Sequence, residues 1–135
     1  MPAQRVVTDR DYQALSGFRT ELRRFLHWSE EQARQAGLTP AQHQLLLAVR
    51  GHGDDDGPTV GDVAEALLLK HHSAVGLVDR AARAGLIKRR RDAKDHRIVR
   101  LRLTADGSRR LSQLSRSHLA ELRRLRSGAL DVLAG

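Results

Sequence analysis

Histidine, serine and basic side chains gather between residues 70 and 97 of this 135-residue chain. A helix is predicted to start near His72 and to carry Gly76 and Arg80 on one face, because residues four apart lie one turn apart. Histidine, serine and arginine side chains can donate hydrogen bonds to purine acceptors or to phosphate oxygens. The pattern therefore predicts a surface that recognises a nucleic acid, made of Lys70, His71, His72, Ser73, Gly76 and Arg80.

Two positions on this face leave alternatives open. Arg80 can contact DNA, or it can form a surface ion pair with Asp79 or with Asp62 of the preceding helix. Glycine inside a helix costs about 1 kcal/mol relative to alanine, so a close approach of the backbone to DNA is one reason to keep Gly76.

A second basic cluster follows in a predicted β-hairpin. Residues 88–91 read Lys-Arg-Arg-Arg, and the hairpin tip contains Lys94, Asp95 and Arg97. A basic tip suits the narrow minor groove, where arginine is favoured. Asp95 and Arg97 are two residues apart, so on a strand they share a face and can pair. Phosphate attraction is expected from Lys88, Arg89, Arg90, Arg91 and Lys94, and the facing of the hairpin decides which of them touch phosphate.

No pattern typical of catalysis or metal binding stands out. Adjacent His71 and His72 would point about 100° apart on a helix, and no HxxxH spacing accompanies them. The three aspartates of the loop 51–58 lack the alternating ligand spacing of a calcium site. No nucleophile–base pair and no glycine-rich phosphate loop appears. We therefore expect neither an enzyme nor a protein with a metal or other cofactor.

Composition restricts the partner and the compartment. A formal net charge of +8 favours a polyanionic partner. The chain has no cysteine, so a disulfide or a thiol redox switch within it is excluded. No apolar run approaches the roughly 20 residues of a membrane span, and the N-terminus lacks the apolar segment of a signal peptide. These features predict a cytoplasmic protein that does not enter a membrane.

The elements that position the basic residues follow from periodicity and caps. Thr59 can cap a helix with Val60, Val63, Ala64 and Leu67 on one side. The next helix, predicted over residues 72–84, would bury Val75, Val78 and Ala82 and end at Gly85. Val99, Leu101 and Leu103 then alternate with arginines, as in a half-buried strand. A helix-turn-helix followed by a hairpin is a winged helix, whose second helix suits the major groove.

Further helices flank this core. One is predicted from Asp9 or Asp11 to about Gln35, and another from Thr39-Pro40 to about Gly51 with Leu45, Leu46, Leu47 and Val49. Thr104 can cap a last helix whose stripe is Leu111, Leu114, His118, Leu122 and Leu125. Ser127-Gly128 is predicted to break or bend that helix before an apolar tail of Ala129, Leu130, Val132 and Leu133.

Several blocks together resemble the MarR (multiple antibiotic resistance regulator) family: Leu77-Val78-Asp79-Arg80, Gly85-Leu86-Ile87, Arg89, Asp95-x-Arg97, Leu103-Thr104 and Gly107. The chain departs from the family at Ala81, where leucine is common, and at His72 and Gly76. The resemblance implies one mainly α domain over residues 1–135 with a small β-hairpin wing. In it, helices 9–36 and 105–135 dimerise and residues 39–104 form the winged helix-turn-helix lobe.

The same resemblance implies a function. It describes a homodimeric, ligand-responsive repressor that binds a palindromic operator, with Arg97 in the minor groove and Asp95 holding its guanidinium. An aromatic or anionic effector would bind near Phe25, His27, Trp28 and His43, although Trp28 can equally serve core or dimer packing. The alternative is a winged-helix module that binds protein or RNA. RNA recognition is less expected, because aromatic stacking residues are missing from the second helix and the hairpin.

Overall fold

The computed structural model describes residues 3–134, with side chains described for residues 3–125. Five helices and one two-stranded antiparallel sheet make up this part of the chain. In order they are α1 (Asp9–Gln35), α2 (Pro40–Arg50), α3 (Val60–Ala66), α4 (His71–Arg83), β1 (Ile87–Arg91), β2 (Val99–Leu103) and α5 (Ala105–Ala134). The fold is thus mainly α with a β-hairpin wing, which confirms the predicted fold class.

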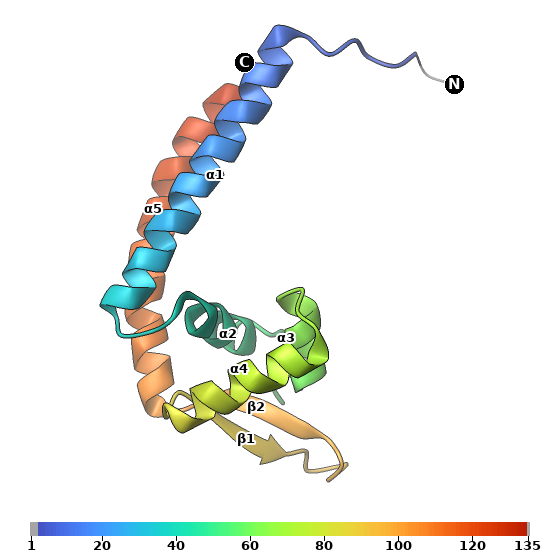
Figure 1. Cartoon of the computed structure of the whole chain (residues 1–135), viewed down its shortest axis with the longest axis vertical. Helices are drawn as coiled ribbons and strands as arrows, with labels where there is room; N and C mark the ends of the chain where they lie inside the picture. Colours follow the sequence, from blue (N-terminus) through green and yellow to red (C-terminus); the bar gives the residue numbers. More distant parts are fainter. Residues whose placement is uncertain (1–2, 135) are drawn as a thin grey trace.

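Two parts of the molecule are distinct in shape (Figure 1). The long helices α1 and α5 run side by side in opposite directions as a stalk, and α2, α3, α4 and the hairpin form a lobe at one end of it. Helix α2 lies at the junction and packs against both stalk helices as well as α3, α4 and β2.

Side-chain caps explain where most of the helices begin. Thr8, Thr39 and Thr59 each accept a hydrogen bond from the backbone amide three residues on, and the side chain at that later position accepts one from the threonine's own amide. These reciprocal pairs satisfy amides that a helix start leaves free. Thr104 caps α5 by accepting from the Gly107 amide at 3.0 Å, as the sequence predicted.

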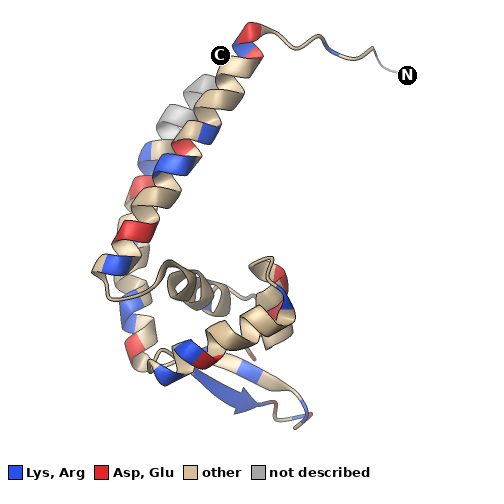
Figure 2. Cartoon of the chain, in the orientation of Figure 1, with Lys and Arg blue, Asp and Glu red and all other residues tan. Residues whose placement is uncertain are grey.

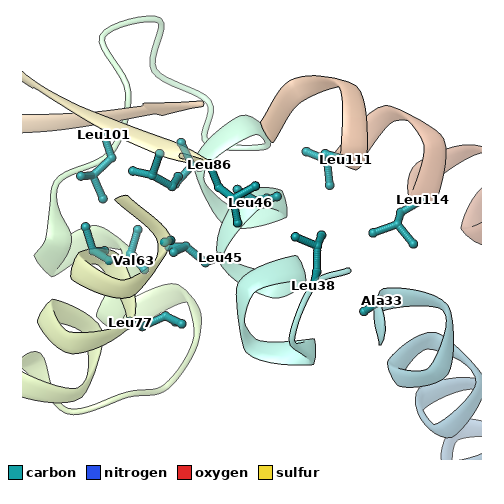
Figure 3. Close-up of a cluster of buried hydrophobic side chains, with 14 residues drawn as sticks. Ala33, Leu38, Leu45, Leu46, Val63, Leu77, Leu86, Leu101, Leu111 and Leu114 are labelled. Carbon is teal, nitrogen blue, oxygen red and sulfur yellow. The ribbon is translucent and has the colours of Figure 1, made fainter. Parts of the chain in front are cut away.

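The hydrophobic core runs from the lobe into the base of the stalk (Figure 3). Leu45 and Leu46 of α2 are fully buried and lie between α4 and the hairpin on one side and α5 on the other. The predicted buried face of α4 was right for Val78 and wrong for its other members. Helix α4 buries Ala74, Leu77 and Ala81 together with Val78, whereas Val75 and Ala82 are only half-buried.

Of the two outcomes predicted at Ser127-Gly128, a break or a bend, the break was wrong, because the backbone of α5 continues as a helix to Ala134. One glycine costs a helix only about 1 kcal/mol, which does not stop a helix that is already formed on both sides. The predicted apolar tail, residues 129–133, lies outside the residues whose side chains are described. Between residues 3 and 134, no helix is both long and apolar enough to cross a membrane.

Candidate nucleic-acid interface

The turn between α3 and α4 sets the angle of the helix-turn-helix. Leu68 has a φ of +55°, in the left-handed region that usually holds glycine. The amides of Leu68 and Leu69 donate to the carbonyls of Glu65 and Ala64 at 3.2 and 2.8 Å, so α3 ends in a Schellman motif. The side chain of Leu68 is almost fully exposed. The sequence carried no glycine signal for this turn.

The first turn of α4 presents free hydrogen-bonding side chains to solvent. Helix α4 begins at His71, one residue earlier than predicted, and Lys70 precedes it without capping it through its side chain. Lys70, His71, His72 and Ser73 are all exposed. Within the described residues, none of these four side chains has a hydrogen-bond or ion-pair partner. Their donors are therefore available to a ligand that approaches the start of α4.

Arg80 lies one turn along α4 from Gly76, and the two are in close contact. A Cβ added at Gly76 would lie 3.1 Å from Nη1 of Arg80, so the missing side chain leaves room for the guanidinium. Neither of the ion pairs considered for Arg80 forms. Asp79 pairs with Arg89, and Asp62 caps α3 by accepting from the Thr59 amide at 3.0 Å.

The Arg89–Asp79 ion pair ties the hairpin to α4. This contact positions β1 against the C-terminal half of α4, while the N-terminal half remains free. Arg91 also uses its guanidinium inside the protein, donating to the carbonyl of His96 at 2.9 Å. The structure thus places two of the five predicted phosphate ligands, Arg89 and Arg91, in contacts within the lobe.

The tip of the wing is a carboxylate-braced turn and not a strand. Asp92 accepts from the amides of Lys94 and Asp95 at 3.0 and 2.8 Å, and Nε of Arg100 lies 3.4 Å from its carboxylate. Asp95 accepts from the amide, Nε and Nη2 of Arg97 at 3.0–3.1 Å. These bonds hold the pKa of Asp95 below its ordinary value, through the side chain of Arg97 first. Arg97 itself is 91% exposed.

The register of the hairpin separates its basic residues into two faces. Pairing of Lys88 with Arg102 and of Arg90 with Arg100 places these four on one face. Ile87, Arg89 and Arg91 share the other face with the buried Leu101. Figure 2 shows that basic residues fill nearly all of β1.

A cluster of aromatic and histidine rings lies where the stalk meets the lobe. The His118 ring centroid is 4.8 Å from those of Trp28 and His43 and 6.0 Å from that of Phe25. Nδ1 of His118 bonds the Leu114 carbonyl at 2.7 Å and must donate there, because a carbonyl only accepts. Burial, and then the nearby His118, lower the pKa of His43.

Three of the four predicted pocket residues therefore come together, and His118 joins them. His27 does not: it is exposed on α1, with Nε2 3.2 Å from a carboxylate oxygen of Glu31. The sequence placed His118 on the stripe of α5, but only the antiparallel packing of α1 and α5 shows that it meets Trp28. Among residues 3–125, whose side chains are described, no group of three or more histidine or acidic side chains is arranged to hold a metal ion.

These features define a winged helix-turn-helix lobe on a long helical stalk, and comparisons identify its relatives. The model of the MarR family matches residues 36–98. The HTH-type transcriptional repressor MdtR of Bacillus subtilis is 32% identical over 77 residues, covering 57% of this chain and 48% of that protein. The matched segment thus spans about half the length of this curated relative.

Solved structures match over more of the chain. A MarR family protein from Bacillus stearothermophilus is 26% identical with a TM-score of 0.75, covering 89% of this chain and 82% of that one. A mutant of MepR from S. aureus, solved bound to an oligodeoxyribonucleotide, is 25% identical with a TM-score of 0.68, covering 86% and 82%. Residues 36–98 of the chain thus resemble the MarR family, and the fold resembles that of a solved MarR family protein.

Proposed function

We propose that this protein is a cytoplasmic transcriptional repressor that binds a palindromic DNA operator as a homodimer. The observation that carries the proposal is that the lobe presents two sets of exposed donors: the free side chains at the start of α4, and Arg97 on the wing. In Figure 1 the start of α4 and the tip of the hairpin lie toward the same end of the lobe. Helix α4 would enter the major groove and Arg97 the adjacent minor groove. The DNA-bound MepR relative and the repressor MdtR support this reading.

An apolar stripe on the stalk supports dimerisation. Tyr12, Leu15, Phe18, Leu22 and Leu26 recur at helical spacing along α1 and are all 43–60% exposed. Leu119 and Leu122 of α5 are exposed in the same way. A contiguous apolar surface of this kind favours burial against another protein surface. A second copy of the chain supplies one, and a two-fold dimer would present two copies of α4 to a palindrome.

The ring cluster supports an effector response. Phe25 and Trp28 belong to the stalk, His43 belongs to α2, and His118 belongs to α5, so the cluster connects the stalk to the lobe. An aromatic or anionic small molecule that entered among these rings would change how the stalk and the lobe pack. That change would alter the spacing of the two copies of α4 and hence the affinity for DNA.

The test is binding to a duplex enriched from a random DNA pool, measured by fluorescence anisotropy. Arg80→Ala plus Arg97→Ala is expected to weaken binding at least about tenfold and to reduce discrimination against scrambled duplex. A matched control, Arg10→Ala plus Arg19→Ala, removes the same charge from α1 and should retain specificity. Equal binding by the two double variants would reject the proposal. Preference for a structured RNA competitor would favour the RNA-binding alternative.

A further inference from the structure

A polar pocket of about 580 Å³ lies beside the hairpin face that carries Lys88, Arg90 and Arg102. Residues of the loop 51–58 and of the end of α2 also line it. The face opposite this one is tied to α4 by the Arg89–Asp79 pair. We call this hollow the rear-wing pocket and define it by Arg50, Lys88, Arg90, Arg102 and Ser108. A second hollow of about 370 Å³ shares Arg50 and Ser108 with it and continues along α5.

The cations around the rear-wing pocket are short of partners. Within the described residues, the side chains of Arg50, Lys88 and Arg90 form no hydrogen bond and no ion pair. Arg102 donates from Nη2 to the carbonyl of Asp55 at 2.7 Å, but its Nε is buried and has no hydrogen-bond partner. By contrast, Arg89 on the other face of the hairpin is engaged by Asp79. Unpaired charges of one sign around a hollow favour a ligand of the opposite sign.

The acidic residues at the rim do not neutralise these cations. Asp54 and Asp55 also line the rear-wing pocket, so four basic side chains face two acidic ones. A carboxylate oxygen of Asp54 accepts from the Asp56 amide at 3.0 Å, within the loop itself. Neither carboxylate forms an ion pair with a basic residue of the pocket. The surplus positive charge therefore stays available.

We infer that the rear-wing pocket binds a free phosphate-bearing anion with at least two negative charges. Guanidinium groups match phosphate oxygens in geometry as well as in charge. The hydroxyl of Ser108, with Ser112 and Ser115 of the adjoining hollow, adds donors along one line of α5. No phenylalanine, tyrosine or tryptophan lines either hollow, and the only ring among their lining residues is the imidazole of His52, so the cations dominate the site and favour the anion over a stacked base. A ligand there would bridge α2, the hairpin and α5.

The inference does not depend on the proposed DNA-binding function, and inorganic pyrophosphate is the probe that tests it. Calorimetric titration of the full chain in buffer with about 0.15 M salt, where surface charge is screened over about 8 Å, is expected to show saturable binding. Lys88→Ala plus Arg90→Ala should weaken that binding at least about tenfold. The matched control is Arg10→Ala plus Arg19→Ala, which should bind pyrophosphate within about twofold of the unmodified chain. Melting temperatures of all three proteins verify that they fold.

Three results would overturn the inference. One is the absence of saturable binding by the unmodified chain, and another is an equal loss in the control variant, which would mean unspecific charge attraction. The third separates the two possible sources of phosphate. If the Lys88 and Arg90 variant loses affinity for duplex DNA but still binds pyrophosphate normally, these cations serve the DNA backbone and the pocket is not a site for a free anion.

Discussion

Gly107 is the position where one added methyl group should do most damage to the joint between lobe and stalk. A Cβ there would lie 2.2 Å from the carbonyl oxygen of Leu86 and 3.1 Å from its carbonyl carbon. Both are backbone atoms, so relief requires α5 to move away from the turn that ends α4. That movement strains two hydrogen bonds of Thr104. Its amide donates to the Leu86 carbonyl at 3.0 Å, and its hydroxyl donates to the Gly85 carbonyl at 2.6 Å.

The cost of Gly107→Ala follows from these contacts. Overpacking costs about 1–3 kcal/mol, and two weakened hydrogen bonds cost about 0.5–1.5 kcal/mol each. The better helix propensity of alanine returns up to about 1 kcal/mol. The expected net loss is about 3 kcal/mol in the free energy of unfolding, or a melting temperature about 10 °C lower.

Urea denaturation followed by circular dichroism measures this loss, with protein concentration held constant because the stability of the proposed dimer would depend on it. Gly17→Ala is the matched control. It makes the same change inside α1, where no heavy atom lies within 4 Å of the new Cβ, and it should stabilise by up to about 1 kcal/mol. Stability of Gly107→Ala within about 0.5 kcal/mol of the unmodified chain would refute the reasoning, since that is the usual range for surface changes.

Four further predictions follow from single residues. Gly76→Ala should raise the free energy of unfolding by up to about 1 kcal/mol, because alanine favours a helix more than glycine does, and denaturation measures this gain. The same change should weaken DNA binding, measured by anisotropy, because the added Cβ displaces the flexible end of Arg80. Leu68→Gly should stabilise by about 1 kcal/mol in the same denaturation assay, since it removes a left-handed leucine with an almost fully exposed side chain. The pKa of His43 is lowered in the folded chain, so below about pH 6.5 the unfolded chain binds a proton at this histidine more readily than the folded chain does. The free energy of unfolding should therefore fall as the pH drops from 7 to 5. His43→Phe should flatten that dependence by at most about 1.4 kcal/mol per pH unit, and an unchanged slope contradicts the assignment. Leu22→Arg should raise the dimer dissociation constant at least about tenfold in sedimentation experiments, because it places a charge in the apolar stripe of α1.

Local signals in the sequence predicted the elements well. Thr39, Thr59 and Thr104 cap helices because each side chain reaches the backbone amide three residues on. The alternation of Leu101 and Leu103 with arginines predicted strand β2. These signals depend on neighbours within a few residues, so no tertiary information was needed.

Facing and long-range contacts were harder to predict. Helix α4 offers two apolar faces at 3–4 spacing, and the core selects the one that contains the small residues Ala74 and Ala81. The register of the hairpin, which sends Arg89 to Asp79 and Arg90 to the opposite face, is fixed by packing of Leu101 in the core. The periodicity of the sequence alone does not predict which face of the hairpin packs against the core.

The candidate site shows the same division. The sequence named the exposed donors at the start of α4 and at the wing tip, because their residue types and their place in a helix-turn-helix suffice. It did not assign His118 to the ring cluster. That contact joins residues 28 and 118, and only the packing of α1 against α5 brings them together.

Selection of bound duplexes from a random DNA pool, repeated at two salt concentrations, tests the central claim most directly. The account predicts a palindrome with half-sites about one helical turn apart, recovered at both concentrations although binding weakens as salt rises. Recovery of no motif, with binding that simply disappears at the higher salt, would contradict it. The exposed donors of α4 and Arg97 would then not read a DNA sequence.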